Sequence, residues 1–213
     1  MTSATASSQR LAPAHTAVVC VECQNGVLGK DSILPALAAD AQPALAAIEK
    51  LLALARSAGV LVVHTPFLGS LGGPGTTPLM RSTARVTAEW APGHPATEIL
   101  TPLLDPTDLV VGRHQGASPT WGTELLPILR ARNIQTLIFA GVSLNVAIPL
   151  AVGQAAHEGF HVIVPRDAVV GTPADYGQLV LRNTIAMLAR VVDVADLATA
   201  WTHAEPEISM PTT

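Results

Sequence analysis

The sequence predicts an α/β protein, a three-layer αβα Rossmann-like fold with a central, mostly parallel sheet of six strands. Short apolar runs of strand length alternate with longer stretches of helical spacing, as in parallel strands joined by right-handed crossovers. The apolar runs are hydrophobic throughout, as expected for strands covered on both faces. The 213 residues suffice for one substantial core, and they contain no internal repeat and no sign of a second domain.

The expected strands are short apolar runs, several of them rich in Val and Ile. They lie at residues 16–21, 60–64, 108–112, 136–140, 160–165 and 191–193. The expected helices repeat apolar residues three or four positions apart, as Leu45, Ile48 and Leu52 do. They lie at residues 41–58, 121–133, 147–159, 175–190 and 195–201.

Residues 66–106 read as a long loop, with a run of Gly and Pro at 72–75 that forbids regular structure. So long a loop in a compact domain is usually functional, and we expect it to form a flap over the ends of the strands. Trp90, Pro92 and His94 are its expected substrate-facing residues, although Trp90 packed as a hydrophobic anchor would fit the sequence equally well.

Composition excludes several classes of partner. Apolar residues make up 49% of the chain but stay in short runs, none of which reaches the roughly 18 residues that span a bilayer. The net charge is −4 without a basic cluster, which argues against nucleic acid. Residues 1–14 lack the apolar core of a signal peptide, so we expect a disordered leader, one domain over 15–203, a tail over 204–213 and a cytoplasmic location.

Two cysteines form a C-x-x-C pattern, Cys20 and Cys23. A redox pair usually sits at a helix N-terminus, whereas this pair lies along a predicted strand and its end. Strand alternation puts Cys20 on the same side as Glu22 and Cys23 on the other. We expect two buried, small hydrophobic side chains, with thiol chemistry near the site as the alternative.

The stretch from Gly141 to Ile148 is expected to be a strand-to-helix turn. Such a turn presents backbone N–H groups and a helix N-terminus at the carboxyl edge of the sheet, where α/β folds bind ligands. Ser143 and Asn145 are its polar side chains, and neither has a neighbouring base in sequence.

Four segments, in order and spacing, resemble the isochorismatase-like (cysteine hydrolase) superfamily over roughly residues 16–201. They are the first strand ending in Glu22, Gln24 and Asn25, the segment 109–114 followed by 122–125, the turn itself, and the segment 159–168. The resemblance implies an enzyme that acts on a small molecule and associates as a homodimer or homotetramer.

All three catalytic positions of that superfamily are changed here. Its cysteine-using members carry an Asp, a Lys and a Cys, and this chain has Glu22 in place of the Asp and Ala147 in place of the Cys. When this segment is aligned with the superfamily from Gly122 and Thr123 without a gap, the lysine position falls on His114. With one inserted residue it falls on Arg113. The superfamily also contains vinyl-ether hydrolases that work without the cysteine, so its loss does not exclude catalysis.

The resemblance makes Glu22 the first candidate for catalysis, as a general acid/base. Its place at the end of a central strand disfavours the charged form, so it could hold a proton near neutral pH; the alternative is a Glu that braces the next loop. Arg113 would clamp a substrate carboxylate or carbonyl, and His114 would exchange protons. The resemblance also implies an oxyanion hole from the backbone of Ser143 and Ala147, and a cis peptide entering Ser143.

Further candidates for substrate binding follow the expected strand ends, the flap and the start of a helix. They are Gln24, Trp90, Ser143, Asn145 and Trp121. One branch of the superfamily binds a metal through an Asp and several His after the second strand. Residues 64–68 hold no such cluster, so we expect neither a metal nor another cofactor.

Two hypotheses from different classes remain open. The first is a hydrolase without a cysteine nucleophile, and the second is a catalytically inactive binding or scaffold protein. The expected helix at 175–190 carries more apolar side chains than one sheet-facing stripe needs, which favours a homo-oligomer. The alternative is that the flap and the C-terminal tail cover the second face within one chain.

Overall fold

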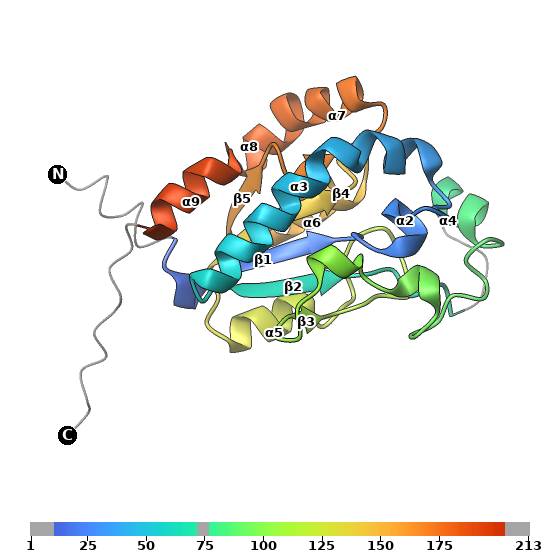
Figure 1. Ribbon diagram of the computed structural model, residues 1–213, viewed down its shortest axis with the longest axis horizontal. Coiled ribbons are helices and arrows are strands. Elements are labelled where there is room, and N and C mark those ends of the chain that lie inside the picture. Colours follow the sequence, from blue (N-terminus) through green and yellow to red (C-terminus); the bar gives the residue numbers. More distant parts are fainter. Residues whose placement is uncertain (1–10, 72–76, 203–213) are drawn as a thin grey trace.

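The computed structural model describes residues 11–71 and 77–202, which fold as a central sheet between two layers of helices (Figure 1). In this part of the chain the sheet has seven strands. Its main path runs β3-β2-β1-β4-β5-β7, and β6 pairs with β4. Each of these pairings is parallel. The predicted αβα fold is confirmed, with one strand more than the six expected.

The strands are β1 (Thr16–Val21), β2 (Leu61–Thr65), β3 (Leu109–Val110), β4 (Thr136–Val142), β5 (His161–Pro165), β6 (Val169–Val170) and β7 (Arg190–Val192). The α-helices are α2 (Asn25–Leu28), α3 (Pro35–Ser57), α4 (Pro78–Thr83), α5 (Leu125–Ala131), α6 (Ala147–His157), α7 (Ala174–Val180), α8 (Ala186–Leu188) and α9 (Val194–Thr202). Single 3-10 turns lie at Pro13–His15, Pro95–Thr97 and Thr101–Leu103, and a π-helical stretch, Leu181–Ile185, joins α7 to α8.

The two central strands, β1 and β4, are buried along their whole length. Side chains of β1 alternate between two cores. Val18 and Cys20 pack with residues of α3 and α9, whereas Ala17, Val19 and Val21 pack with α5 and α6. Because helices cover both faces, these strands need apolar residues on both sides, which explains the hydrophobic runs that follow Thr16 and Thr136.

The expectation that Cys20 and Cys23 face opposite sides is wrong, because both lie in the core beneath α3. Glu22 between them has a φ of 53°, so the strand's alternation ends at this residue. Both cysteines are free and at most 1% exposed.

The first long helix begins at Pro35 and not near residue 41, and it continues through Pro43. Proline is well suited to the first position of a helix, where its missing N–H costs nothing. Pro43 removes the bond to the carbonyl of Ala39, but both residues are exposed, so water can take that carbonyl.

Two other expected helices differ from the structure. The helix expected at 121–133 begins at Leu125, because Gly122 adopts a positive φ of 67°. Thr120 does not cap it; its hydroxyl donates to Gln154 at 2.9 Å. The helix expected at 175–190 is divided into α7, the π-helical stretch and α8.

The segment 66–106 is more regular than expected. It contains α4, which is capped by the hydroxyl of Thr77, and two 3-10 turns. The Gly and Pro run at 72–75 lies outside the described residues, as do residues 1–10 of the expected leader and the tail 204–213. Leu11 packs against the core and accepts a hydrogen bond from the indole of Trp201.

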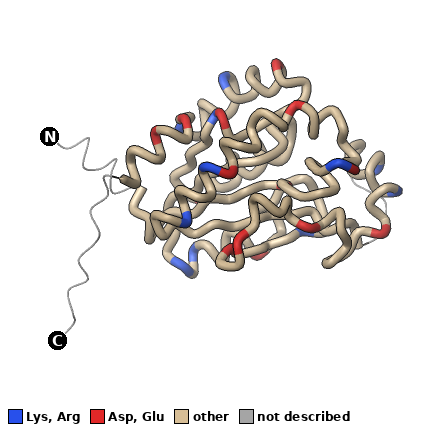
Figure 2. The backbone as a smooth tube through the Cα atoms, in the orientation of Figure 1, with Lys and Arg blue, Asp and Glu red and all other residues tan. Residues whose placement is uncertain are grey.

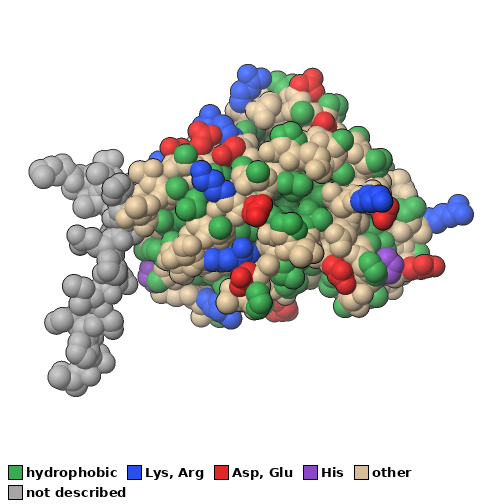
Figure 3. Space-filling view, viewed as in Figure 1, with side chains coloured by type: hydrophobic (Ala, Val, Ile, Leu, Met, Phe, Trp, Pro, Cys, Tyr) green, Lys and Arg blue, Asp and Glu red, His purple; other side chains and the backbone are tan. Residues whose placement is uncertain are grey.

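Acidic and basic residues are interspersed along the backbone (Figure 2). The face drawn in Figure 3 carries both signs among apolar residues, without a large area of one charge. No helix within residues 11–71 and 77–202 combines the length and the apolar character that crossing a membrane requires.

Candidate active site

The candidate site lies where the winding of the sheet changes direction. From β1 the chain moves to β2 and β3 on one side, and it then continues from β4 to β5 and β7 on the other. β1 and β4 are therefore neighbours whose crossovers lead away from each other, which opens a crevice at their carboxyl ends. Glu22 follows β1 and Ser143 follows β4, so the two meet at this crevice.

Glu22 is held in an unusual backbone conformation. Its φ of 53° is left-handed, which for a residue other than glycine costs of order 1 kcal/mol. The side chain is 15% exposed and lines a cavity. Strained residues of this kind concentrate at functional sites, so the conformation supports a role for Glu22 beyond bracing the loop.

Arg113 forms an ion pair with Glu22 through its Nη2 and the carboxylate Oε1. Its side chain is 3% exposed, and its Nε and Nη2 also donate to the carbonyls of Gly116 and Ala117. The guanidinium carbon lies 5.6 Å from the centre of the Phe67 ring. Its Nη1 is buried and has no hydrogen-bond partner within the described residues.

The backbone brings Arg113 to Glu22. Phe67 and Arg113 form a parallel bridge beyond the ends of β2 and β3, in which Arg113 N donates to Pro66 O at 3.0 Å and Leu68 N to Arg113 O at 2.8 Å. The guanidinium of Arg113 therefore lies directly against the carboxylate of Glu22.

The strand-to-helix turn contributes the opposite wall of the site. The peptide between Val142 and Ser143 is cis, as the resemblance implied, and Ala147 is the first residue of α6. The carbonyl of Ser143 accepts hydrogen bonds from Val146 N and Ile148 N, which fixes the entry into the helix. Ser143 and Ala147 both line the cavity, beside the positive end of the α6 dipole.

The cavity encloses about 80 Å³. Glu22 and Arg113 are the charged members of its lining within the described residues. Its other polar side chains are hydroxyls, those of Ser143, Thr83 and Thr87. Most of the remaining wall is hydrocarbon, from Val27, Ile33, Leu34, Leu37, Phe67, Leu79, Met80, Trp90, Ala117, Val146 and Ala147.

Two expected binding residues instead hold the backbone together. Gln24 is fully buried; its Oε1 accepts from Phe67 N at 2.6 Å, and its Nε2 donates to the carbonyls of Phe67 and Ala96 at 2.9 Å each. Asn145 accepts from Thr172 N at 2.8 Å and donates to Thr172 O at 2.6 Å. Both amides already have backbone partners, and neither residue lines the cavity.

Four other candidates also lie outside the cavity lining. His114 points its Nδ1 at the carbonyl of Gly69, 3.0 Å away, and Trp121 is 68% exposed. Pro92 is not part of the lining, and the ring of His94 accepts a hydrogen bond from Ala96 N. Of the flap residues we expected, Trp90 is the one that reaches the cavity.

Sequence reasoning missed the part of the lining that comes from apolar residues. Phe67 lies two residues beyond the end of β2, and its place after a strand could have identified it. Leu79 and Met80 come from α4, a helix that we did not expect. Leu34 and Leu37 lie where α3 begins earlier than its spacing suggested.

A second buried polar cluster lies beneath α3, away from the cavity. Cys20 and His64 are register neighbours in β1 and β2, and His64 Nε2 lies 2.9 Å from the carboxylate of Asp108. The Cys23 thiol and the imidazole lower the pKa of Cys20 to about 6, against burial, which raises it. The hydrogen bond with Cys20, together with burial, raises the pKa of Cys23 well above its ordinary value.

Neither cysteine lines the cavity, so its geometry provides no thiol at the site. No three His, Cys, Asp or Glu side chains in the described part of the chain are placed to hold a metal ion.

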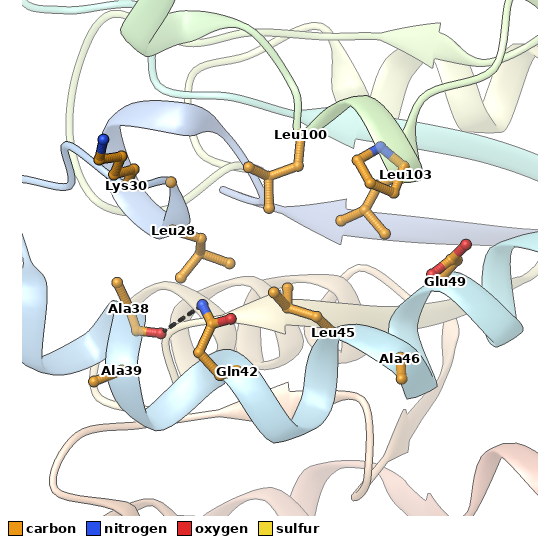
Figure 4. A pocket seen from close by; sticks show the side chains of 12 residues that line it. Leu28, Lys30, Ala38, Ala39, Gln42, Leu45, Ala46, Glu49, Leu100 and Leu103 are labelled. Atoms are coloured by element: carbon orange, nitrogen blue, oxygen red, sulfur yellow. Dashed lines mark hydrogen bonds between the residues drawn. The ribbon is translucent and has the colours of Figure 1, made fainter.

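A larger, open groove of about 680 Å³ runs along α3 (Figure 4). Leu45 of α3 faces Leu28, Leu100 and Leu103 across it, and Gln42 donates a hydrogen bond to Ala38 O at 3.2 Å. None of the candidate catalytic residues lines this groove. The small cavity at the sheet edge, and not the larger groove, is therefore the candidate active site.

The fold and the site together define an αβα protein with a Glu–Arg ion pair at the point where the winding of its parallel sheet reverses. The family model described as "Isochorismatase domain" matches residues 16–196. This chain therefore belongs to the isochorismatase family.

Known proteins of the same kind resemble most of the chain. Ureidoacrylate amidohydrolase RutB of Methylobacterium radiotolerans is 28% identical over 211 residues, which cover 89% of this chain and 81% of that protein. Maleamate amidohydrolase of Pseudomonas putida is 32% identical over 134 residues, which cover 59% and 60%. The crystal structure of a cysteine hydrolase from Pseudomonas syringae pv. phaseolicola superposes with a TM-score of 0.77 at 25% identity, covering 89% of this chain and 93% of that one.

Proposed function

We propose that this protein is a hydrolase of a small organic molecule that works without a cysteine nucleophile, with Glu22 as general acid/base. The observation that carries the proposal is that the Glu22 carboxylate and the start of α6 at Ala147 line the same cavity. The loss of the thiol at Ala147 leaves Glu22 as the group there that is able to move a proton.

Glu22 would act first as a base. Arg113 occupies its Oε1, so its other oxygen would accept a proton from a bound water. The resulting hydroxide adds to the carbonyl carbon of an amide and gives a tetrahedral intermediate. The protonated Glu22 then donates the same proton to the leaving nitrogen as the C–N bond breaks, which gives a carboxylic acid and an amine and regenerates the carboxylate of Glu22.

The turn would stabilise the negative oxygen of that intermediate. Backbone N–H groups of Ser143 and Ala147 are the expected donors, beside the N-terminus of α6. A preformed donor of this kind typically lowers the barrier by about 3 to 4 kcal/mol. Because such donors belong to the main chain, the change to alanine at residue 147 would not remove them.

The names of the relatives suggest the reaction to test first. Two of the proteins similar to this chain are named for hydrolysis of ureidoacrylate and maleamate, both of which contain an amide-type C–N bond. Amide hydrolysis is therefore the leading reaction, ahead of the vinyl-ether hydrolysis that the sequence resemblance also allows.

The experiment is an assay of the purified protein on a panel of small amides, ureides and isochorismate, followed by the Glu22→Gln variant. Glutamine keeps the size of the side chain but cannot accept the proton, so turnover should fall at least about 100-fold. The Glu124→Gln variant is the matched control, because Glu124 is exposed and its side chain makes no capping bond at α5.

Unchanged turnover in Glu22→Gln would overturn this mechanism. Replacing Cys20 and Cys23 together by alanine should leave turnover close to that of the parent protein. A loss there, with the fold intact by circular dichroism, would instead support thiol chemistry.

The alternative is a binding protein that has lost catalysis. It is favoured by the ion pair itself, since Arg113 already occupies one carboxylate oxygen of Glu22, and by the alanine at residue 147. Tight binding of a panel compound without turnover by the parent protein would support this alternative over hydrolysis.

A further inference from the structure

We propose that the cavity selects a small, neutral amide or ureide with an apolar body and discriminates against ligands that carry a carboxylate. This inference deepens the proposed hydrolase function and rests on it for the site. It is tested by binding, so it can hold or fail whether or not the protein shows turnover.

The charges of the cavity are already balanced. Glu22 and Arg113 pair with each other, and the other described residues of the lining are uncharged. A ligand with a carboxylate would add a negative charge for which the lining offers no second cation. Because an unpaired charge is costly to bury, such a ligand should bind poorly.

The ion pair leaves one donor and one acceptor for a ligand. Arg113 Nη1 is buried without a hydrogen-bond partner in the described residues, and an unsatisfied buried donor is unfavourable. Glu22 uses Oε1 for Arg113, which leaves its second oxygen as an acceptor. An amide or ureide group presents the matching acceptor, its carbonyl oxygen, next to the matching donor, its N–H.

A carboxylate lacks one half of that match. It can accept from Arg113 Nη1, but it has no proton to donate to Glu22, and the two negative groups would repel each other. The pair therefore favours the neutral ligand twice, through its hydrogen bonds and through its charge.

The remaining wall determines size and polarity. A cavity of about 80 Å³ is smaller than the roughly 150 Å³ that holds benzene, so the ligand has no more than about six non-hydrogen atoms. Phe67 and Trp90 form a tilted aromatic pair, with ring centres 6.1 Å apart, and both line the cavity. A branched or short hydrocarbon body fits this wall better than a second polar group.

The test compares isobutyramide with isobutyrate, which share one carbon skeleton and differ in the terminal group. Dissociation constants for the parent protein are measured by ligand-observed NMR at pH 7. Isobutyramide should bind at least about tenfold more tightly than isobutyrate, and more tightly than maleamate, which carries a carboxylate.

Two variants attribute the preference to Arg113. Arg113→Lys keeps the charge beside Glu22 but lacks the second nitrogen of the fork, so the preference for isobutyramide should shrink several-fold. Arg182→Lys, at an exposed position, is the control and should keep the parent preference. If Arg113→Lys does not fold, the ligand comparison on the parent protein still decides the proposal.

Equal or tighter binding of isobutyrate overturns the proposal, and so does a lack of binding by every neutral amide of this size. Binding of isobutyramide without hydrolysis would support the neutral-ligand cavity while contradicting the hydrolase. Hydrolysis of maleamate in preference to isobutyramide would support the hydrolase and contradict the selectivity.

Discussion

At the scale of single residues, Asp108 holds together the polar cluster beneath α3. Its carboxylate accepts from Arg56 at 2.6 and 3.1 Å, from Asp105 N at 3.0 Å, and lies 2.9 Å from His64 Nε2. The side chains of Asp108 and His64 are at most 1% exposed. The cluster connects the start of β3 to α3 and β2. It therefore supports the strand that precedes Arg113.

Asp108→Asn should destabilise the fold by about 3 kcal/mol, because it leaves the Arg56 charge and a buried imidazole without their carboxylate. Urea unfolding measures the loss as a lower midpoint with an unchanged slope. Asp31→Asn, at an exposed position, is the control and should leave the midpoint close to that of the parent. Equal midpoints for both variants would contradict the structural role of the cluster.

The difference between Asp108→Asn and the parent should depend on pH. Burial raises the pKa of Asp108, but Arg56 and His64 lower it below its ordinary value. The contribution of Asp108 to the stability of the fold is thus present above about pH 4 and is lost as the pH falls through the lowered pKa.

His64 titrates in the opposite direction. Burial lowers the pKa of His64, but Cys20 and Asp108 raise it overall. Its contribution is present below about pH 6.5 and is lost as the pH rises through the raised pKa, so the difference should be largest between about pH 4 and 6.5.

The candidate residues illustrate what sequence can and cannot predict at this scale. The positions of Glu22 and Ser143 follow from strand ends, which apolar runs mark well. The partner of a polar side chain is not marked: Gln24 and Asn145 have the residue types of ligand-binding groups, but their amides pair with backbone. Arg113 and His114 both follow a strand, and the bridge to Phe67, which no pattern reveals, brings Arg113 to Glu22.

At the scale of elements, α3 combines good helical spacing with a proline in its interior. Pro43 is the ninth residue of the helix Pro35–Ser57, and it removes one backbone hydrogen bond. The buried side of α3, with Ile48, Leu51 and Leu52 fully covered, holds the helix in place despite that loss. Packing therefore overrides a strong local signal, which is why sequence spacing began the helix too late.

Pro43→Ala should stabilise the protein by about 1 to 2 kcal/mol. The new N–H can donate to Ala39 O, and this gain exceeds the entropy that proline removes from the unfolded chain. The measurement is the midpoint of thermal unfolding, expected to rise by a few degrees. Pro35→Ala is the control, because proline at the first helical position costs nothing there, and its midpoint should not rise.

Other elements were missed for reasons of length. β6 has two residues and pairs only with the end of β4. The sequence therefore contains no apolar run of strand length that would predict it. The stretch from α7 to α8 reads as one helix because its side chains keep near-helical spacing, whereas the backbone widens into a π-helical stretch at Leu181–Ile185. Periodicity identifies such segments but does not resolve their hydrogen-bond pattern.

At the scale of the whole molecule, the winding of the sheet explains why the site is where it is. Parallel strands direct their carboxyl ends to one edge, and the reversal between β1 and β4 keeps helices from covering that point. The order of strands and helices along the chain predicts this arrangement without any knowledge of side-chain contacts. The lining of the cavity depends on α4 and on the entry to α3, whose positions come from tertiary packing.

The surface formed by α6, α7 and α8 leads to the last prediction. Of the apolar residues expected there, Leu181 and Ile185 are buried in the core, but Leu179 is 46% and Met187 82% exposed. Leu150 of α6 is 49% exposed, and α6 packs against α8, so apolar side chains stay uncovered on both helices. We propose that a second copy of this chain covers this surface, since the described residues leave it open.

Light scattering at micromolar concentration should therefore give a mass of at least twice the 22.0 kDa of one chain. The double variant Leu179→Glu and Met187→Glu should lower that mass to a single chain, because two carboxylates in an apolar interface lose their hydration without gaining partners. Trp121→Glu, at an exposed aromatic residue on another part of the chain, is the control and should keep the parent mass. A parent mass near 22.0 kDa would contradict the proposed association.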